Sequence, residues 1–492
     1  MAVSSVKNKE ALRKKLWPLL LEAAALHNVL PLTSSCNLRC LFCSHRQNPP
    51  GLKVYYFRPL SFKLLQDLIS LLDGSRKIII GESATRLCEG EPLTHPHFLA
   101  VIKELRKRFP RTPLQITTNG ALLSKSILSE LAALGEQQSS AATKSGRGSL
   151  MERYPAKLEL VISLNSSSPA RRAKIMGDSQ PQQALQAVAI CRKYSLPFHG
   201  SIVACPDDSD NGWEDLKRTL FFLEEMGALT TRVFLPGWTR FSAQSCSGSF
   251  FSLWRELDDF LEGLKEKIGH PVLLEPPLKD DLRAVVEGVI RNSPAEQAGL
   301  KRKDVICRIN GEEALTGADS FYKIQKSALP HLEVLREEKR GAVSEIQRKP
   351  LSFVLPKKKG EPSGLVFSYD LEGGTIARVA REIERKNAQE PFLFTSRAAV
   401  SFWKAAQRDA LLPQKLKIDV VENAFFGGSI CCAGLLTVYD FRKHLEKMTS
   451  KGQRPDLIII PLKPFDSRGL DLRGEHYEDL QRVFPQFSFS FL

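Results

Sequence analysis

The chain has 492 residues, of which 42% are hydrophobic and 25% are charged, a composition that excludes a disordered or collagen-like protein. Its length predicts about three domains, and ten cysteines over that length are too dilute for a secreted disulfide scaffold. The 70 Lys and Arg residues exceed the 55 Asp and Glu residues by 15, which suggests an anionic partner, either nucleic acid or a membrane surface.

Residues 1–28 form the first predicted element, a basic helix. Its apolar stretch, Leu16–Leu26, contains Pro18 and Glu22, and no small-residue cleavage site follows it. These features argue against a signal peptide, and no run of the sequence reaches the roughly 18 apolar residues of a membrane-spanning helix. We expect the helix to cap a domain, with an interfacial membrane helix as the alternative. We also expect a cytoplasmic protein with reduced cysteines.

Residues 29–275 form the second predicted part, in which short apolar runs alternate with longer amphipathic stretches. The predicted strands are Val29–Leu32, Lys77–Ile80, Leu114–Thr117, Leu158–Leu164, Phe198–Ala204 and Arg232–Leu235. The predicted helices are Phe62–Leu72, Phe98–Arg108, Lys125–Leu134, Gln182–Tyr194 and Trp213–Met226. This alternation predicts an α/β domain with a parallel sheet. Within it, residues 137–155 are rich in Ser, Gly, Lys and Arg, which predicts a flexible surface insertion.

Two further domains are predicted after this sheet. Residues 276–360 contain Asn310-Gly311 between apolar runs, which predicts a tight hairpin in a small β-rich module. Residues 361–492 again mix helices and strands, which predicts a C-terminal α/β domain. There we expect Cys431 and Cys432 on a strand, facing opposite sides, buried and inert. A redox or auxiliary-cluster role for one of them, together with Cys88, is the alternative.

Three cysteines close together in the sequence carry the strongest functional signal. Cys36, Cys40 and Cys43 follow the first predicted strand, so their thiolates must converge on one site. Three thiolates supply a four-iron cluster with three protein ligands and leave one iron open. Loops at the carboxyl ends of parallel strands are also where such folds place their chemistry. A structural zinc site with His45 as fourth ligand, or three unrelated buried cysteines, are the alternatives.

The CxxxCxxC spacing, with Phe42 before the third cysteine, resembles the radical S-adenosylmethionine (radical SAM) superfamily. The resemblance implies a partial (β/α)6 barrel and a [4Fe–4S] cluster on Cys36, Cys40 and Cys43, with Phe42 packed beside the cluster and the adenine. It also implies that the open iron binds SAM, whose reductive cleavage yields a 5′-deoxyadenosyl radical that abstracts hydrogen from a substrate. An electron donor such as ferredoxin or flavodoxin would supply the reducing electron.

Three shorter motifs follow in the order expected of that superfamily. Gly90-Glu91-Pro92 is similar to its GGEP segment, with Glu89 in place of the first glycine, and Thr118-Asn119-Gly120 resembles its TNG segment. Ser163 and Asn165 fall where members contact the SAM ribose and carboxylate. The resemblance therefore assigns SAM contacts to Phe42, Gly90, Glu91, Pro92, Thr118, Asn119, Ser163 and Asn165. The stretch Gly81–Cys88 is longer and more polar than is usual for the family.

The middle of the chain resembles a PDZ domain of the bacterial protease type. The matching residues are Ser293, Pro294, Ala295, Ala298, Gly299, Leu300, Asp304, Ile306, Asn310 and Gly311. The resemblance implies a peptide or protein partner, bound as an added edge strand. A purely architectural module is the alternative, because Asp280 and Asp281 would repel a peptide carboxylate.

The last third resembles a domain of unknown function that accompanies a radical SAM barrel and a PDZ domain. The matching segments are Val421–Asn423, Phe425–Gly428, Ala433–Thr437, Asp440 and Arg468–Asp471. The relatives place the PDZ domain first, whereas here the PDZ-like segment follows the barrel. Taken together, the chain is expected to be a radical SAM enzyme, an oxidoreductase acting on an unknown substrate, for which a peptide or protein is one candidate. A PDZ-based scaffold with a degenerate barrel and an RNA-modifying enzyme are the alternatives.

Overall fold

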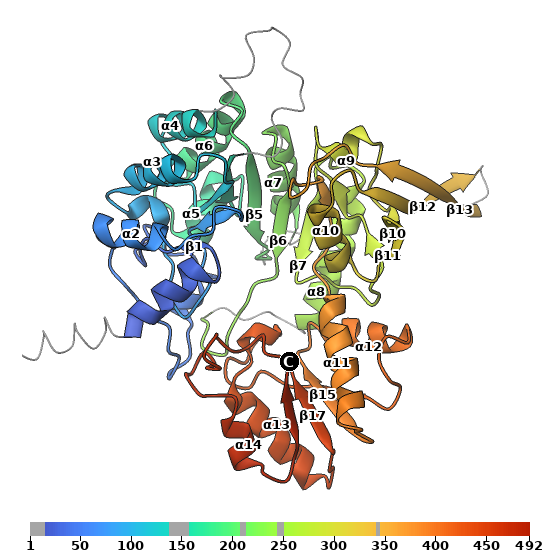
Figure 1. Ribbon diagram of the computed structural model, residues 1–492. Coiled ribbons are helices and arrows are strands. Elements are labelled where there is room, and N and C mark those ends of the chain that lie inside the picture. The colour runs from blue at the N-terminus through green and yellow to red at the C-terminus, as the bar shows by residue number, and fades with distance from the viewer. Residues whose placement is uncertain (1–14, 137–156, 207–212, 244–249, 341–344) are drawn as a thin grey trace, which may run out of the picture. The chain divides into compact units, whose positions relative to one another are not determined.

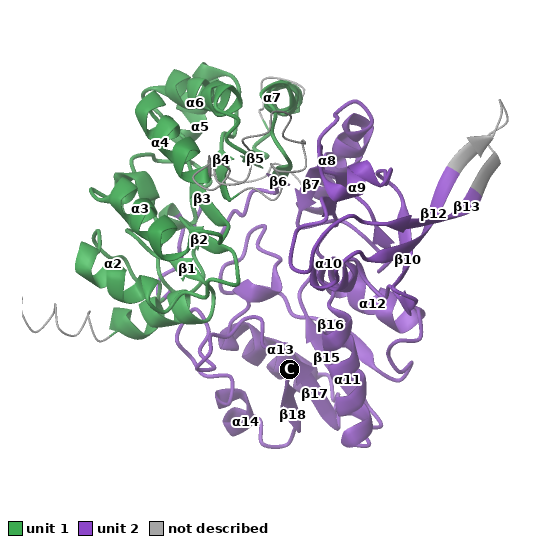
Figure 2. Cartoon of the chain, turned by 45° about the horizontal axis from the view of Figure 1, so that its top comes forward, with its two compact units in different colours: residues 1–46, 53–232 green, residues 47–52, 233–492 purple. Residues whose placement is uncertain are grey.

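Figure 1 shows the computed structural model of the chain, which describes residues 15–136, 157–206, 213–243, 250–340 and 345–492. The first half of the predicted basic helix and the predicted insertion at residues 137–155 lie outside the described residues. The chain divides into two compact units (Figure 2). Unit 1 comprises residues 1–46 and 53–232, and unit 2 comprises residues 47–52 and 233–492.

Unit 1 contains a parallel sheet whose strands follow the order of the chain. They are β1 (Val29–Leu30), β2 (Ile78–Ile80), β3 (Leu114–Thr118), β4 (Leu158–Ser163) and β5 (Phe198–Val203). Each pairs in parallel with the next, so all five end at one edge of the sheet. β6 (Thr231–Phe234) lies where the chain passes from unit 1 into unit 2, and β7 (Val272–Glu275) belongs to unit 2. The prediction of a parallel α/β sheet is confirmed.

Helices connect these strands, and α3, α4 and α6 lie along one side of the sheet (Figures 1 and 2). A first helix spans residues 15–25. The others of unit 1 are α2 (Phe62–Ile69), α3 (Phe98–Arg108), α4 (Lys125–Glu136), α5 (Pro169–Met176), α6 (Pro181–Lys193) and α7 (Glu214–Glu225), with the short 3₁₀ helices Ser44–Arg46 and Pro92–Thr94. In α3, the apolar residues Val101, Ile102 and Leu105 recur at helical spacing and are fully buried. The five helices predicted between the strands are confirmed, whereas α5 was not predicted.

Unit 2 continues with α8 (Phe250–Lys265) and then a β-rich module. Its strands are β8 (Ala284–Val285), β9 (Gly288–Val289), β10 (Val305–Ile309), β11 (Glu312–Glu313), β12 (His331–Arg340), β13 (Glu345–Val354) and β14 (Leu365–Val366), and its helices are α9 (Pro294–Gln297) and α10 (Gly317–Lys326). All of the strand pairings in this module are antiparallel. The predicted hairpin turn is confirmed: Asn310 and Gly311, with φ of 53° and 82°, join β10 to β11.

The C-terminal part of unit 2 is a small α/β sandwich of three layers. Its parallel strands are β15 (Pro391–Thr395), β16 (Lys417–Val420), β17 (Leu457–Ile460) and β18 (Phe489–Phe491), in the order β16-β15-β17-β18. One apolar core joins α11 (Gly373–Arg385) and α12 (Val400–Arg408) to the sheet, and a second joins α13 (Val438–Ser450) and α14 (Asp479–Val483) to it. The helices therefore cover both faces, as in doubly wound folds.

The prediction that Cys431 and Cys432 lie on a strand is wrong. Both lie in a loop directly before the 3₁₀ helix Ala433–Leu435. Strand alternation does not apply to a loop, and the two thiols form a hydrogen bond with each other.

Among the described residues, no helix is both long and apolar enough to cross a bilayer.

Candidate functional site

The cysteine loop follows β1 at the carboxyl edge of the sheet in unit 1. Backbone hydrogen bonds fix it to the end of α5: the N–H of Arg39 donates to the carbonyl of Met176 at 2.9 Å, and the N–H of Leu41 donates to that of Ile175 at 2.8 Å. The loop is therefore held by a helix that lies more than 130 residues further along the chain. No disulfide involves Cys36, Cys40 or Cys43.

The electrostatics of the three thiols show that they lie near one another. Burial, together with the neighbouring thiols of Cys43 and Cys36, raises the pKa of Cys40 to about 12. Burial also raises the pKa of Cys36, to which Glu91 and Cys43 add. In the described part of the chain, no three His, Cys, Asp or Glu side chains gather closely enough to hold one metal ion. A four-iron cluster does not require that geometry, because each thiolate binds a different iron.

His45, the fourth ligand of the zinc alternative, lies against another cysteine. Its Nε2 is 3.1 Å from Sγ of Cys88, and its Nδ1 is 3.4 Å from the same sulfur. Tyr56 also hydrogen-bonds to Cys88, which is buried. Cys88 therefore forms a small polar cluster with a histidine and a tyrosine.

The Gly90-Glu91-Pro92 segment runs directly beside the residues that precede Cys36. The N–H of Gly90 donates to the carbonyl of Thr33, and the N–H of Glu91 donates to that of Ser35, both at 2.8 Å. A Cβ atom at position 90 would lie 2.1 Å from the Ser35 carbonyl oxygen, so only glycine fits there. Pro92 begins the 3₁₀ helix that follows.

Glu91 acts as an acceptor that fixes the end of β3. Its carboxylate accepts hydrogen bonds from the Thr118 hydroxyl and the Asn119 N–H, both at 2.7 Å, and from the Leu93 N–H at 3.3 Å. The side chain is almost fully buried, which raises its pKa to about 7 against the opposing effect of these hydrogen bonds. Thr118 and Glu91 are thus bonded to each other within the protein, and we assign both a positioning role.

Asn119 brings the next strand end to the cysteine loop. Its Nδ2 donates to Oδ1 of Asn37 at 2.9 Å and lies 3.9 Å from Sγ of Cys36. Its Oδ1 accepts from the Ala121 N–H at 2.9 Å. The sequence did not single out Asn37, although its place directly after Cys36 makes it a natural partner for a strand-end amide.

Arg172, on α5, is the functional residue that the sequence analysis missed. It is fully buried, and its guanidinium donates to the carbonyls of Asn119 and Leu164, both at 2.6 Å, and to that of Ser163 at 3.2 Å. Its Nε donates to Asp178 at 2.8 Å. Since these carbonyls end β3 and β4, one side chain aligns two strand ends with the helix that carries the cysteine loop.

The remaining predicted residues lie at the same edge with different partners. Asn165 has a φ of 63°, and its Oδ1 accepts from the Val203 N–H at 2.7 Å. Its Nδ2 donates to the Ser163 carbonyl at 3.2 Å, so the Asn165 amide is engaged within the protein. Phe42 is half-buried in the cysteine loop.

Glu89 stands where the GGEP motif has its first glycine, and its carboxylate is buried. Both of its oxygens are buried, and neither has a hydrogen-bond partner among the described residues. Burial raises its pKa well above the ordinary value. Three features suit an iron–sulfur cluster with a cationic ligand beside it. The thiols are reduced, and position 90 must be glycine because the backbone of Ser35 lies so close. The buried Glu89 carboxylate has no hydrogen-bond partner among the described residues.

Comparison with known proteins agrees with this geometry. Residues 30–142 match the model of the radical SAM superfamily. This segment is a radical SAM domain. Members of the superfamily use a [4Fe–4S] cluster and SAM. The radical SAM domain spans the cysteine loop, the Gly90-Glu91-Pro92 segment and Thr118-Asn119.

The curated relatives are similar to part of this chain. A GTP 3′,8-cyclase of Paenarthrobacter nicotinovorans is 27% identical over 194 residues, which are 37% of this chain and 52% of the relative. A tungsten-containing aldehyde ferredoxin oxidoreductase cofactor-modifying protein of Pyrococcus furiosus is 37% identical over 108 residues, which are 22% of this chain and 27% of the relative. The chain thus spans about half of the length of the first relative and about a quarter of the second.

Two solved structures are similar over half of the chain. SuiB of Streptococcus suis bound to S-adenosylmethionine has a TM-score of 0.35 and 15% identity, covering 50% of this chain and 49% of that one. Native anSMEcpe with bound AdoMet has a TM-score of 0.34 and 15% identity, covering 50% of this chain and 62% of that one.

Proposed function

We propose that this chain is a radical SAM enzyme in which Cys36, Cys40 and Cys43 hold a [4Fe–4S] cluster. The cluster and SAM, when bound, supply a 5′-deoxyadenosyl radical for hydrogen abstraction from a substrate. The observation that supports the proposal most is the junction of Asn119 with Asn37 and Cys36, which brings the cysteine motif and a strand-end motif to one place.

The protein's own residues then divide into two groups. Gly90, Asn119, Ser163 and Phe42 lie at or beside the cysteine loop and the strand ends, and we assign them to the SAM site. Asn119 belongs to both groups, because its amide also bonds to Asn37. We assign Glu91, Thr118, Asn165 and Arg172, which bond to other protein groups, to fixing the carboxyl edge of the sheet. A rigid edge of this kind is what a site needs to hold its ligands in one geometry.

The proposal extends to the rest of the chain in three parts. We assign residues 29–275 to a partial (β/α)6 barrel, residues 276–360 to a PDZ-like module and residues 361–492 to the C-terminal domain. The PDZ-like assignment is supported by Ser293, whose hydroxyl accepts from the Glu296 N–H at 3.3 Å to cap α9, and by the Asn310-Gly311 hairpin. A peptide or protein substrate is the class that such a module would present.

Cluster loading tests the proposal. The purified full chain is reconstituted without oxygen with iron and sulfide, and its iron content is measured. We expect about four irons per chain, less than about one for Cys40→Ser, and the wild-type content for Cys307→Ser, a half-buried thiol of β10. Addition of SAM should change the electron paramagnetic resonance spectrum of the reduced wild-type protein. Equal iron contents in the wild type and Cys40→Ser would refute the assignment of the ligands.

A further inference from the structure

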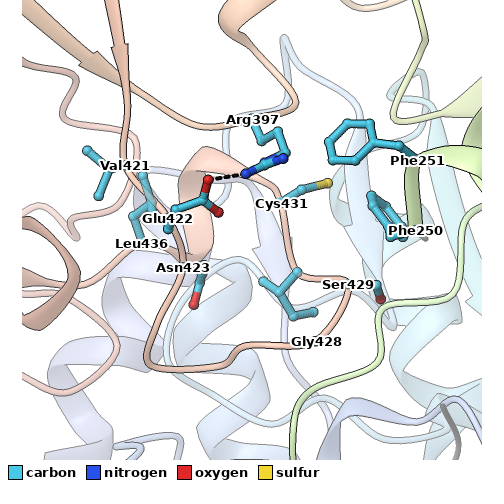
Figure 3. A pocket seen from close by; sticks show the side chains of 11 residues that line it. Phe250, Phe251, Arg397, Val421, Glu422, Asn423, Gly428, Ser429, Cys431 and Leu436 are labelled. Carbon is cyan, nitrogen blue, oxygen red and sulfur yellow. Dashed lines mark hydrogen bonds and ion pairs between the residues drawn. The ribbon is translucent and has the colours of Figure 1, made fainter. Parts of the chain in front are cut away.

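A second candidate site lies within unit 2, in the C-terminal α/β sandwich. A cavity of about 280 Å³ opens where β15 and β16 end (Figure 3). Arg397 follows β15, and Val421, Glu422 and Asn423 follow β16. In parallel α/β sheets, ligands bind outside the carboxyl ends of the strands, beside the point where helices leave for opposite faces. Here α12, after β15, and α13, after β16, pack on opposite faces of the sheet.

Two opposite charges face each other in this cavity. Arg397 and Glu422 form an ion pair, drawn as a dashed line in Figure 3, and their side chains are 42% and 65% exposed. An ion pair with that exposure contributes little free energy, so a ligand can replace it at small cost. Since the two charges cancel, the cavity suits a ligand that carries one charge of each sign rather than a net anion or cation.

The other side of the cavity is apolar. Phe250 and Phe251, at the start of α8, lie across the cavity from Glu422 (Figure 3), and their ring centroids are 5.8 Å apart. The Arg397 guanidinium carbon lies 4.9 Å from the centre of the Phe251 ring, so the charged and apolar parts of the lining adjoin. Leu436 contributes a buried apolar side chain to the lining.

The loop that frames the cavity is held in one conformation. Gly428 has a φ of 63°, and a Cβ atom there would lie 2.1 Å from the Trp238 carbonyl oxygen. The Ser429 hydroxyl donates to the Pro236 carbonyl and accepts from the Trp238 N–H, both at 2.8 Å. Gly428 and Ser429 therefore fix the shape of this cavity, and a preformed cavity binds at lower entropic cost.

We propose that this cavity binds a free α-amino acid with an apolar side chain. The ligand carboxylate would pair with Arg397, its ammonium with Glu422, and its side chain would contact Phe250 and Phe251. The volume is at the low end of the range for small-molecule sites, which favours a single amino acid over a nucleotide or a peptide. A peptide terminus also carries only one of the two groups, an ammonium or a carboxylate, whereas the cavity offers a partner for each. This proposal does not rest on the proposed radical chemistry.

Calorimetric titration of the full chain with L-leucine, L-isoleucine and L-phenylalanine tests it. L-Methionine is left out, because the proposed SAM cleavage would release it at the other site. We expect at least one of the three to bind with a Kd of about 1 mM or tighter. L-Leucinamide lacks the carboxylate and N-acetyl-L-leucine lacks the ammonium, and each should bind at least about tenfold more weakly than leucine.

Two variants identify the partner of each charge. Arg397→Gln should bind leucine and leucinamide equally, because it has lost the partner of the carboxylate that leucinamide lacks. Glu422→Gln should bind leucine and N-acetylleucine equally, because it has lost the partner of the ammonium that N-acetylleucine lacks. Arg482→Gln, which removes one partner of an exposed ion pair on α14, is the control and should behave as wild type. The proposal is overturned if none of the three amino acids binds at about 10 mM, or if both cavity variants keep the discrimination of the wild type.

Discussion

At the scale of single residues, the radical SAM domain is organised by side chains that bond to one another. Glu91 accepts three hydrogen bonds while almost fully buried, and Asn119 joins β3 to the cysteine loop. The identities of Glu91 and Asn119 follow from the sequence motifs. Their roles do not, because a motif gives the order of residues but not the direction in which each side chain points.

Glu91→Gln should destabilise the protein. An amide has one acceptor oxygen where the carboxylate has two, so a buried donor at Thr118 or Asn119 loses its partner. At a pH above 7, where Glu91 is ionised, we expect the free energy of unfolding in urea to fall by about 1–3 kcal/mol. Glu130→Gln, on the exposed surface of α4, is the matched control and should cost less than about 1 kcal/mol. Equal losses for the two variants would contradict the role of Glu91.

Cys432 should react with iodoacetamide before Cys431. The hydrogen bond between the two thiols lowers the pKa of Cys432 and raises that of Cys431, and the thiolate is the nucleophile. Tandem mass spectrometry after short labelling near neutral pH should find the label on Cys432, which is also the more exposed of the two. Cys431→Ala should slow that labelling, since it removes the stabilising donor. Preferential labelling of Cys431 would refute this account.

At the scale of elements, α5 shows what the sequence analysis missed and why. Ser168 caps its start, Pro169 stands in its first turn and Gly177 ends it with a φ of 62°, so the local signals of a short helix are present. Its role was not visible, because Arg172 donates to the carbonyl of Asn119, which follows β3 and lies 53 residues away in the chain. Such long-range bonds depend on the packing of the whole sheet.

Removal of Arg172 should be among the most damaging single changes in unit 1. Arg172→Met would leave Asp178 and three backbone carbonyls buried without their donor. We expect a loss of about 3–5 kcal/mol in the free energy of unfolding. Arg192→Met, which removes one exposed hydrogen bond to the Glu225 carbonyl, should change stability by less than about 1 kcal/mol. A similar small loss for Arg172→Met would show that the strand ends are held in another way.

The amino ends of the same strands carry a separate polar group. Glu159, at the start of β4, bonds to Lys77 before β2, and its Oε2 lies 3.6 Å from Nε2 of His199 on β5. Burial opposes ionisation of Glu159, but the bonds and charges of His199 and Lys77 outweigh it and lower its pKa to about 2. This group therefore stabilises the sheet at the edge opposite the cysteine loop.

That depressed pKa predicts a dependence of stability on pH. The stabilisation by Glu159 is present above the ordinary pKa of 4.5 and is lost as the pH falls from 4.5 toward 2, because the folded state then holds fewer protons than the unfolded state. Wild type should lose stability relative to Glu159→Gln over this range, by at most about 1.4 kcal/mol per pH unit. The unfolding free energies of both proteins, measured at several pH values, check this. Parallel curves would contradict the shifted pKa.

At the scale of the whole molecule, local patterns in the sequence predicted the parallel sheet and most helices, and the cysteine motif indicated the candidate site. They did so because strand and helix periodicities and the CxxxCxxC spacing are contained in short segments. The cavity at Arg397 and Glu422 was not predictable, since its lining comes from three separate stretches of the chain. The loop at Cys431 was mispredicted because a short apolar run fits a strand and a loop equally well.

Three of the basic residues behind the net charge of +15 are engaged by groups within the protein. Two of the basic residues, Arg106 and Arg172, are buried and donate to backbone carbonyls, so they serve the fold rather than an anionic partner. Arg302 pairs with Glu262 and Glu266. RNA modification therefore gains no support from these residues.

The central claim, radical SAM chemistry at Cys36, Cys40 and Cys43, is tested most directly by the products of SAM. The reconstituted wild-type chain is incubated with SAM and a strong reductant without oxygen, and 5′-deoxyadenosine and methionine are quantified. We expect both to form in equal amounts, and neither to form with Cys40→Ser. A wild-type protein that holds about four irons and yet releases no 5′-deoxyadenosine would contradict it.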